Sequence, residues 1–237
     1  MGRRFAERSP ETEWMDTEAV SLDDYRSCLK DLATVNVVTM THGPILKWLD
    51  RAVRHLSPQD RVTILDVGYG YGDLLRRIHA WSRRRNRPVN LIGVDLNPMS
   101  EPIARAATLP GVSIDFRTGN VFDFRPERPV DFIICSQTTH HMSNDELAAF
   151  IRWMEQVATR GWFIADLHRH PIPFHFFRVL SWAAGWHRFV RHDGPISIAR
   201  SFRRKDWEDI LASAGLEPGT AEIRWYPSFR LCVSRSK

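Results

Sequence analysis

The stretch that decides the fold is ILDVGYGYGD, residues 64–73 of a 237-residue chain. An apolar run ends in three alternating glycines, and a helical pattern follows. Glycines let the backbone turn sharply and approach a ligand closely, because no Cβ stands in the way. The G-x-G-x-G spacing differs from the G-x-G-x-x-G that grips a dinucleotide pyrophosphate. Asp66, two positions before the first glycine, would repel a phosphate and attract a cationic ligand.

Short apolar runs alternate with helical patterns around this stretch. The predicted strands cover residues 62–67, 90–95, 112–117, 131–136 and 162–167, with helices predicted at 71–82, 98–107 and 144–158. Apolar strands that alternate with helices indicate a doubly wound, parallel α/β sheet. Two further runs, 220–226 and 229–234, flank Pro227 and predict a closing hairpin. We therefore expect seven strands, the last one antiparallel.

The remaining segments are assigned around this core as parts of one domain. A polar lead (1–20) precedes an N-terminal helical cap (21–60), the cofactor-binding core (61–170), a substrate lid (171–200) and a terminal helix with the strand hairpin (201–237). The predicted lid carries six aromatic residues between 174 and 189. An aromatic lid suits a flat or lipophilic substrate. Packing against the core, or an interfacial helix at a membrane, would explain the same composition.

Composition narrows the class of protein. Hydrophobic residues make up 43% and charged residues 26%, as in an ordinary globular chain. Three cysteines lack C-x-x-C spacing, which argues against a zinc cluster or a disulfide scaffold and fits a reducing cytoplasm. The first twenty residues lack an apolar signal core, so we expect a cytoplasmic protein. The net charge of +5 comes from arginine, which suits anionic partners such as nucleic acid or membranes.

Residues 66–72 resemble motif I of the class I S-adenosylmethionine-dependent methyltransferases. Three more segments follow in the order of that family: 93–97 at the end of the second strand, 119–122 after the third, and 131–141 with its His-His pair. The resemblance covers about residues 60–170. It implies a Rossmann-like fold and S-adenosylmethionine as cofactor.

The resemblance also implies which residues bind the cofactor. Asp95 would hydrogen-bond both ribose hydroxyls. Asn120 stands where the family usually has Asp; its amide oxygen would still face the adenine amino group, without the charge. The implied cofactor-binding set is Asp66, Gly68, Tyr69, Gly70, Gly72, Asp95, Leu96, Asn120, Val121, Ser136 and Gln137.

Histidines indicate the chemistry at the acceptor. Histidine titrates near neutrality, so it is a natural base for a phenol or an enol. His140 follows the fourth strand and His168 the fifth, where a doubly wound sheet opens at its ligand crevice. We expect His140 or His168 to be the base, with Asp166 as its orienting partner. Candidate substrate contacts are His141, Phe177, Trp182, Arg191 and His192, the last two before a presumed Gly194-Pro195 turn.

The lid and the segment after the fifth strand resemble a bacterial small-molecule subgroup related to quinone-biosynthesis and polyketide-pathway methyltransferases. This resemblance implies methyl transfer to a hydroxyl, or an activated carbon, of an aromatic or polyketide-like molecule in secondary metabolism. One alternative is an RNA methyltransferase that uses the arginines at 83–87; another is a catalytically inactive binding protein. Those arginines are predicted at a helix end away from the crevice, which disfavours nucleic acid. No metal constellation is evident in the sequence, and a magnesium site of scattered carboxylates stays open.

Overall fold

The structure, a computed structural model, describes residues 5–237, so the first four residues of the predicted polar lead lie outside it. The strands form one sheet in the order β3-β2-β1-β4-β5-β7-β6, in which β7 runs opposite to all the other strands. The predicted α/β class, seven strands and closing antiparallel strand are confirmed. The strands are β1 (Val62–Val67), β2 (Val89–Asp95), β3 (Asp115–Thr118), β4 (Val130–Ser136), β5 (Ala158–Leu167), β6 (Glu222–Tyr226) and β7 (Arg230–Ser236).

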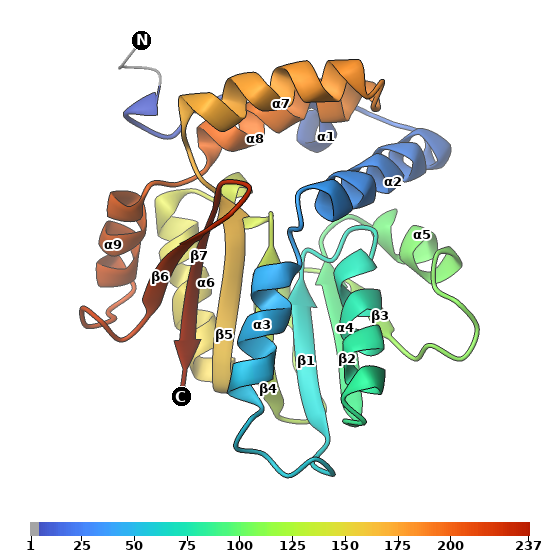
Figure 1. The fold of residues 1–237 in the computed structure, drawn as a ribbon, viewed down its shortest axis with the longest axis vertical. Helices are drawn as coiled ribbons and strands as arrows, with labels where there is room; N and C mark the ends of the chain where they lie inside the picture. Colours follow the sequence, from blue (N-terminus) through green and yellow to red (C-terminus); the bar gives the residue numbers. More distant parts are fainter. Residues whose placement is uncertain (1–4) are drawn as a thin grey trace.

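Helices pack on both faces of this sheet and across one of its edges (Figure 1). They are α1 (Trp14–Thr17), α2 (Leu22–Val38), α3 (Gly43–Ala52), α4 (Asp73–Arg84), α5 (Ser100–Ala106), α6 (Asn144–Val157), α7 (Pro171–Ala183), α8 (Arg188–Arg200) and α9 (Arg204–Ser213), with short 3₁₀ turns η2 (Val121–Asp123) and η3 (Thr139–His141). In Figure 1, α1, α2, α7 and α8 lie above the edge where the parallel strands end. A ligand crevice is expected at that edge in this type of sheet.

Side chains of β1 point alternately to the two faces of the sheet, and they belong to two separate hydrophobic clusters. Leu65 and Val67 pack with α6 and α9 on one face of the sheet, whereas Val62 and Ile64 pack with α3 and α4 on the other. All six residues of β1 are buried, as a central parallel strand requires. The first helix after β1 begins at Asp73 rather than at the predicted Tyr71. Gly72 has a positive φ of 71°, which keeps the chain out of the helix until that point.

The N-terminal segment is fastened beneath α7 and α8 by buried polar groups. The Arg169 guanidinium, fully buried, donates to the carbonyl oxygens of Phe5 (3.1 Å) and Ser201 (2.6 Å). The Asp193 carboxylate on α8 accepts from the backbone N–H groups of Trp14 (2.9 Å) and Met15 (3.0 Å). These contacts position α1 over the strand ends.

The presumed turn at Gly194-Pro195 is wrong, because both residues lie inside α8. Gly194 serves close helix packing there: a Cβ at this position would lie 2.0 Å from Cε1 of Phe177 on α7. A glycine that is required for close helix packing cannot be distinguished by sequence alone from a glycine in a turn. Within residues 5–237, no helix is both long and apolar enough to cross a bilayer.

Replacing Gly194 with Ala should destabilise the α7–α8 contact, because the new methyl group must displace the Phe177 ring. We expect a loss of about 1–3 kcal/mol in the free energy of unfolding, measured by urea denaturation. Gly43→Ala is the matched control, since nothing lies within 4 Å of a Cβ placed there. Equal stability of the two variants would contradict the packing.

Candidate active site

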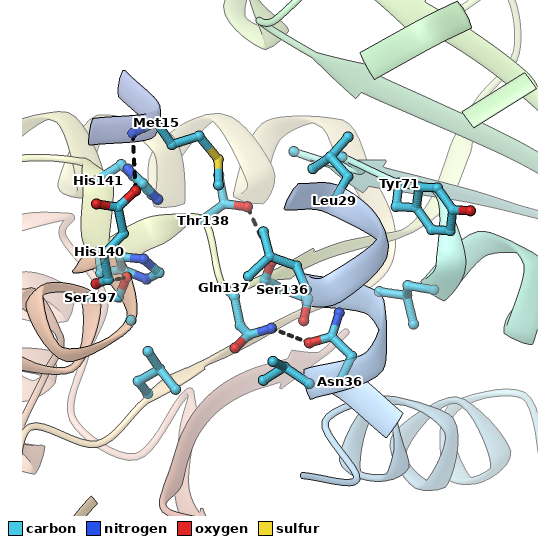
Figure 2. Close-up of a pocket in the computed structure, with 18 of the residues that line it drawn as sticks. Met15, Leu29, Asn36, Tyr71, Ser136, Gln137, Thr138, His140, His141 and Ser197 are labelled. Atoms are coloured by element: carbon cyan, nitrogen blue, oxygen red, sulfur yellow. Dashed lines mark hydrogen bonds between the residues drawn. The ribbon is translucent and has the colours of Figure 1, made fainter. Parts of the chain in front are cut away.

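A cavity of about 760 Å³ opens at the edge where the parallel strands end. The loops after β1, β2 and β4 line it together with α2, α7 and α8. Figure 2 shows Leu29 and Asn36 of α2 facing the same space as Gln137 and Thr138 of the loop after β4. The volume lies in the range of small-molecule sites.

The glycine loop after β1 forms one wall of the cavity. Gly68, Gly70 and Gly72 have φ angles of 72°, 49° and 71°, which side chains rarely adopt. A Cβ at Gly68 would lie 2.4 Å from Oγ1 of Thr138, so only glycine lets the loops after β1 and β4 meet. Gly68, Tyr69 and Gly70 line the cavity.

Two carboxylates stand beside this loop. Asp95 at the end of β2 accepts from the N–H of Gly70 (2.8 Å) and from that of Asn97 (2.8 Å). Burial raises its pKa, and those hydrogen bonds hold the increase back. Asp66 lines the cavity with both carboxylate oxygens buried and without a hydrogen-bond partner. Its burial, and then the nearby Asp73 and Asp95, raise its pKa well above the usual range. An unpartnered buried carboxylate suits a cationic ligand.

The other residues predicted to bind the cofactor lie around the same cavity. Five of them line it: Leu96, Asn120, Val121, Ser136 and Gln137. Gly72 does not line it, although its neighbours Tyr71 and Asp73 do. The Asn120 side chain accepts from the N–H of Phe122 (3.0 Å), which leaves its amide oxygen one further lone pair. Ser136 has a buried hydroxyl oxygen without a partner.

The predicted pairing of His140 with Asp166 is present in the geometry. Nδ1 of His140 lies 2.8 Å from Oδ1 of Asp166, which is fully buried at the end of β5. Burial would raise the pKa of Asp166, but His140 and a hydrogen bond from Thr139 lower it to about 2. The other predicted base, His168, also lines the cavity, but its Nδ1 is buried without a partner. Burial, and then His170, lower the pKa of His168.

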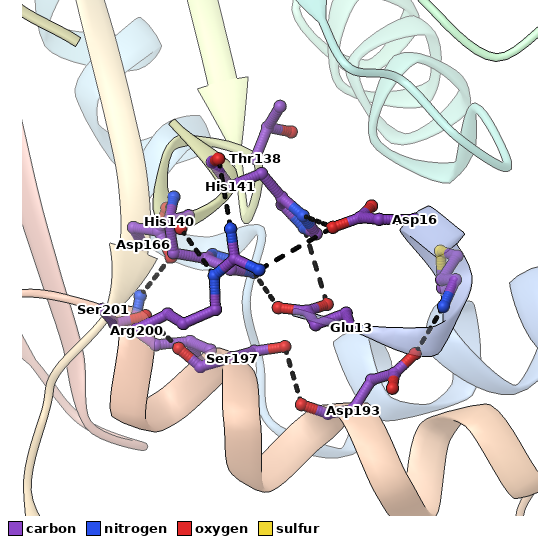
Figure 3. Close-up of polar contacts among 12 residues, drawn as sticks. Glu13, Asp16, Thr138, His140, His141, Asp166, Asp193, Ser197, Arg200 and Ser201 are labelled. Carbon is purple, nitrogen blue, oxygen red and sulfur yellow. Dashed lines mark hydrogen bonds and ion pairs between the residues drawn. The ribbon is translucent and has the colours of Figure 1, made fainter. Parts of the chain in front are cut away.

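A second histidine pairing lies next to the first (Figure 3). Nδ1 of His141 is 2.9 Å from Oδ2 of Asp16. Glu13, at the start of α1, directs its carboxylate toward both imidazoles, 3.6 Å from Nε2 of His140 and 3.7 Å from Nε2 of His141. Arg200 of α8 donates to the carbonyl oxygens of both histidines, which holds the η3 turn in place.

Of the candidate substrate contacts, His141 and Phe177 line the cavity and the other three do not. Trp182 is 74% exposed on the outer face of α7. The His192 ring stacks on Trp14 with 3.5 Å between ring centroids, and Arg191 is exposed beside it. Trp182, Arg191 and His192 therefore stand apart from the cavity lining, and the last two belong to helix α8 rather than to a turn.

Sequence reasoning missed Glu13 and Asp16. Both belong to a segment with no motif, and long-range contacts hold that segment near the histidines, among them those of Arg8, Arg169 and Asp193. The available signal was the apolar residues Phe5, Trp14 and Met15 inside a mostly polar lead. Apolar residues in such a segment indicate that it packs against the domain.

The comparisons agree with this geometry. The methyltransferase domain family matches residues 34–220 of the chain. The fold is similar to that of the plantazolicin methyltransferase BpumL in complex with SAH (TM-score 0.63, 12% identity, 91% of this chain and 96% of that chain). It is similar also to magnesium protoporphyrin IX methyltransferase from Synechocystis with bound SAH (0.57, 15%, 93% and 89%) and to the citrinin polyketide synthase CMeT domain (0.58, 14%, 82% and 52%). No curated protein matches the chain.

S-adenosylmethionine is the cofactor of this fold. The glycine loop, the two acidic residues beside it and the family match lead to one conclusion: the chain belongs to the methyltransferase domain family and is a class I, S-adenosylmethionine-dependent enzyme.

Proposed function

We propose that the enzyme methylates a hydroxyl group of an aromatic or polyketide-like, lipophilic small molecule, with an activated carbon as the other acceptor atom. The observation that carries this proposal is that His140, paired with Asp166, lines the same cavity as the glycine loop. A base held next to a methyl-donor site is what a weakly nucleophilic hydroxyl requires. A role in secondary metabolism or quinone-type biosynthesis follows from that acceptor class.

The residues beside the glycine loop fit the cofactor. S-adenosylmethionine supplies an electrophilic methyl group on a positively charged sulfur. The free oxygens of Asp66 suit its ammonium group, and Asp95 suits the two ribose hydroxyls. Asn120 would face the adenine amino group through the remaining lone pair of its amide oxygen. Both carboxylates favour a cationic donor over a phosphate-bearing one.

The His140–Asp166 pair would handle the proton. Because Nδ1 of His140 faces Asp166, its Nε2 is the nitrogen left for the acceptor. Nε2 takes the hydroxyl proton while the oxygen lone pair forms the bond to the methyl carbon. The carbon–sulfur bond breaks, its electron pair stays on sulfur, and S-adenosylhomocysteine leaves. Asp166 offsets the charge that develops on the imidazole.

The walls of the cavity favour an apolar acceptor. Phe177 and Leu180 of α7 and Ile198 of α8 line it, and Phe176, 64% exposed, lies at its rim. Val179 and Trp182 continue an exposed apolar stripe along α7. Such a rim suits a lipophilic acceptor delivered from a membrane surface, through peripheral contact.

Nucleic acid fits this site poorly. The arginines at 83–87 lie at the C-terminal end of α4 (Figure 1), whereas Asp73 and Leu74 at its N-terminal end line the cavity. Cations are favoured at a helix C-terminus by the helix dipole alone. The basic charge of the chain therefore needs no RNA partner to explain it.

Replacing Asp95 with Ala should weaken S-adenosylmethionine binding about tenfold or more, or about 1.4 kcal/mol, because ribose contacts and the bond to Gly70 are both lost. Isothermal titration calorimetry measures this directly. Asp209→Ala on the surface of α9 is the control and should bind like the wild type. An unchanged affinity of the Asp95 variant would refute the ribose role.

Replacing His140 with Gln should lower kcat by about 10²–10⁴-fold while donor affinity stays within about twofold, because only proton transfer is lost. His175→Gln, an exposed histidine on α7, is the matched control. If His168→Gln loses activity and His140→Gln does not, the base is His168 instead. S-adenosylhomocysteine release in chelator-treated buffer is the readout.

Phenols with alkyl chains of increasing length test the acceptor class. Each buried methylene contributes about 0.8 kcal/mol, so kcat/KM should rise about fourfold per carbon until the cavity is filled. Methylation of RNA at a rate that falls steeply with salt, without turnover of any phenol, would contradict the proposal.

A further inference from the structure

Three side chains that line the cavity bring their ligand atoms together. Glu13, His140 and His141 each offer one such atom, and these lie within 4.8 Å of one another. The two glutamate–histidine distances are 3.6 and 3.7 Å. Ligands bound at 2.0–2.1 Å around a tetrahedral ion are about 3.3 Å apart. The two contacts use different carboxylate oxygens, Oε1 toward His140 and Oε2 toward His141, and both are slightly longer than this ligand spacing.

The buried Glu13 carboxylate faces two histidines. Its side chain is 3% exposed, and Oε1 has no hydrogen-bond partner. Within residues 5–237, only the two histidines lie within ion-pair distance of it, and no lysine or arginine does. A buried carboxylate costs several kcal/mol unless it is paired or coordinates a metal. The unpartnered oxygen faces His140.

The far nitrogen of each imidazole is held by a carboxylate. Asp166 lies 2.8 Å from Nδ1 of His140, and Asp16 lies 2.9 Å from Nδ1 of His141. A neutral imidazole that donates from Nδ1 carries its lone pair on Nε2. Metal-binding histidines almost always donate their other N–H in this way, which fixes the tautomer and the ring orientation. Both Nε2 atoms therefore face Glu13 as ligands (Figure 3).

The surrounding contacts hold these ligands in place. Arg200 fixes the backbone of both histidines, and Asp193 fixes the start of α1 immediately after Glu13. His141 is 28% exposed, which provides access from solvent. The carboxylates of Glu13, Asp16 and Asp166 supply three negative charges around one position. A divalent cation would balance two of these charges, and the remaining negative charge would still favour a positively charged methyl donor.

We propose that Glu13, His140 and His141 form a binding site for a divalent first-row transition-metal ion. Two imidazoles and one carboxylate are a ligand set that Zn²⁺ and Fe²⁺ use, and three protein ligands leave a coordination position open. His140 and His141 line the cavity, so that position is next to the acceptor.

Cation binding and proton transfer use the same nitrogen of His140. In the loaded protein Nε2 is a ligand, and in the chelated protein it is free to act as a base. The proposed metal site is inferred from the geometry of the three side chains, and it does not depend on which acceptor the enzyme methylates. Titrations without donor or acceptor report the site, and transfer assays in chelator report the base, so either proposal can fail alone.

The test is a titration of the chelator-treated protein with Zn²⁺ by calorimetry and with Co²⁺ by visible absorption. We expect one tight equivalent. Glu13→Gln and His141→Gln should each weaken binding about 100-fold or more, and Asp16→Asn about 10–100-fold, as for an outer-shell partner. His175→Gln, which removes an exposed histidine elsewhere, should bind like the wild type.

Thermal unfolding supplies a second readout. Zn²⁺ should raise the Tm of the wild type and of His175→Gln, and the rise should vanish in Glu13→Gln. Melting of each variant without the ion shows whether it is folded. Absence of a stoichiometric site in the wild type, or equal affinity in a folded Glu13→Gln variant, would overturn the proposal.

Discussion

The steric constraint at Gly68 connects the parts of this active site. Its backbone approaches Thr138 so closely that a Cβ would lie 2.4 Å from the threonine hydroxyl oxygen. The loop after β1, with Asp66, therefore touches the loop after β4, which leads directly into the η3 turn that carries His140. Residues of both loops line one cavity, and the close approach between the loops requires glycine at position 68.

The acidic and basic side chains near the cavity have different surroundings. The arginine excess suggested an anionic partner, yet the groups facing the cavity beside the donor loop are the carboxylates of Asp66 and Asp95. Arginines near the site instead form hydrogen bonds within the protein. Arg200 and Arg169 donate to backbone carbonyls and fix the turn and the N-terminal segment. The basic composition thus supports the scaffold around a site that favours a cationic ligand.

The sequence predicted those features that depend on local pattern. The glycines at 68–72, with Asp66 two positions before them and Asp95 at the end of the next strand, indicate the fold, because their spacing specifies one strand-to-helix turn. The sequence offered His140 or His168 as the partner of Asp166, since all three lie at the ends of the neighbouring parallel strands β4 and β5. Glu13 could not be placed, because its position depends on long-range contacts from α8 that leave no periodic signal. Gly194 was misread because a glycine for helix packing and one for a turn look alike.

The proposed function rests on one spatial claim, that the acceptor hydroxyl lies between the methyl group of the donor and Nε2 of His140. The most direct measurement is a crystal structure with S-adenosylhomocysteine bound. We expect its ribose hydroxyls on Asp95 and its sulfur between the Gly68–Gly70 backbone and His140. A complex in which the sulfur faces away from His140, with Asp66 and Asp95 left without contacts, would contradict it.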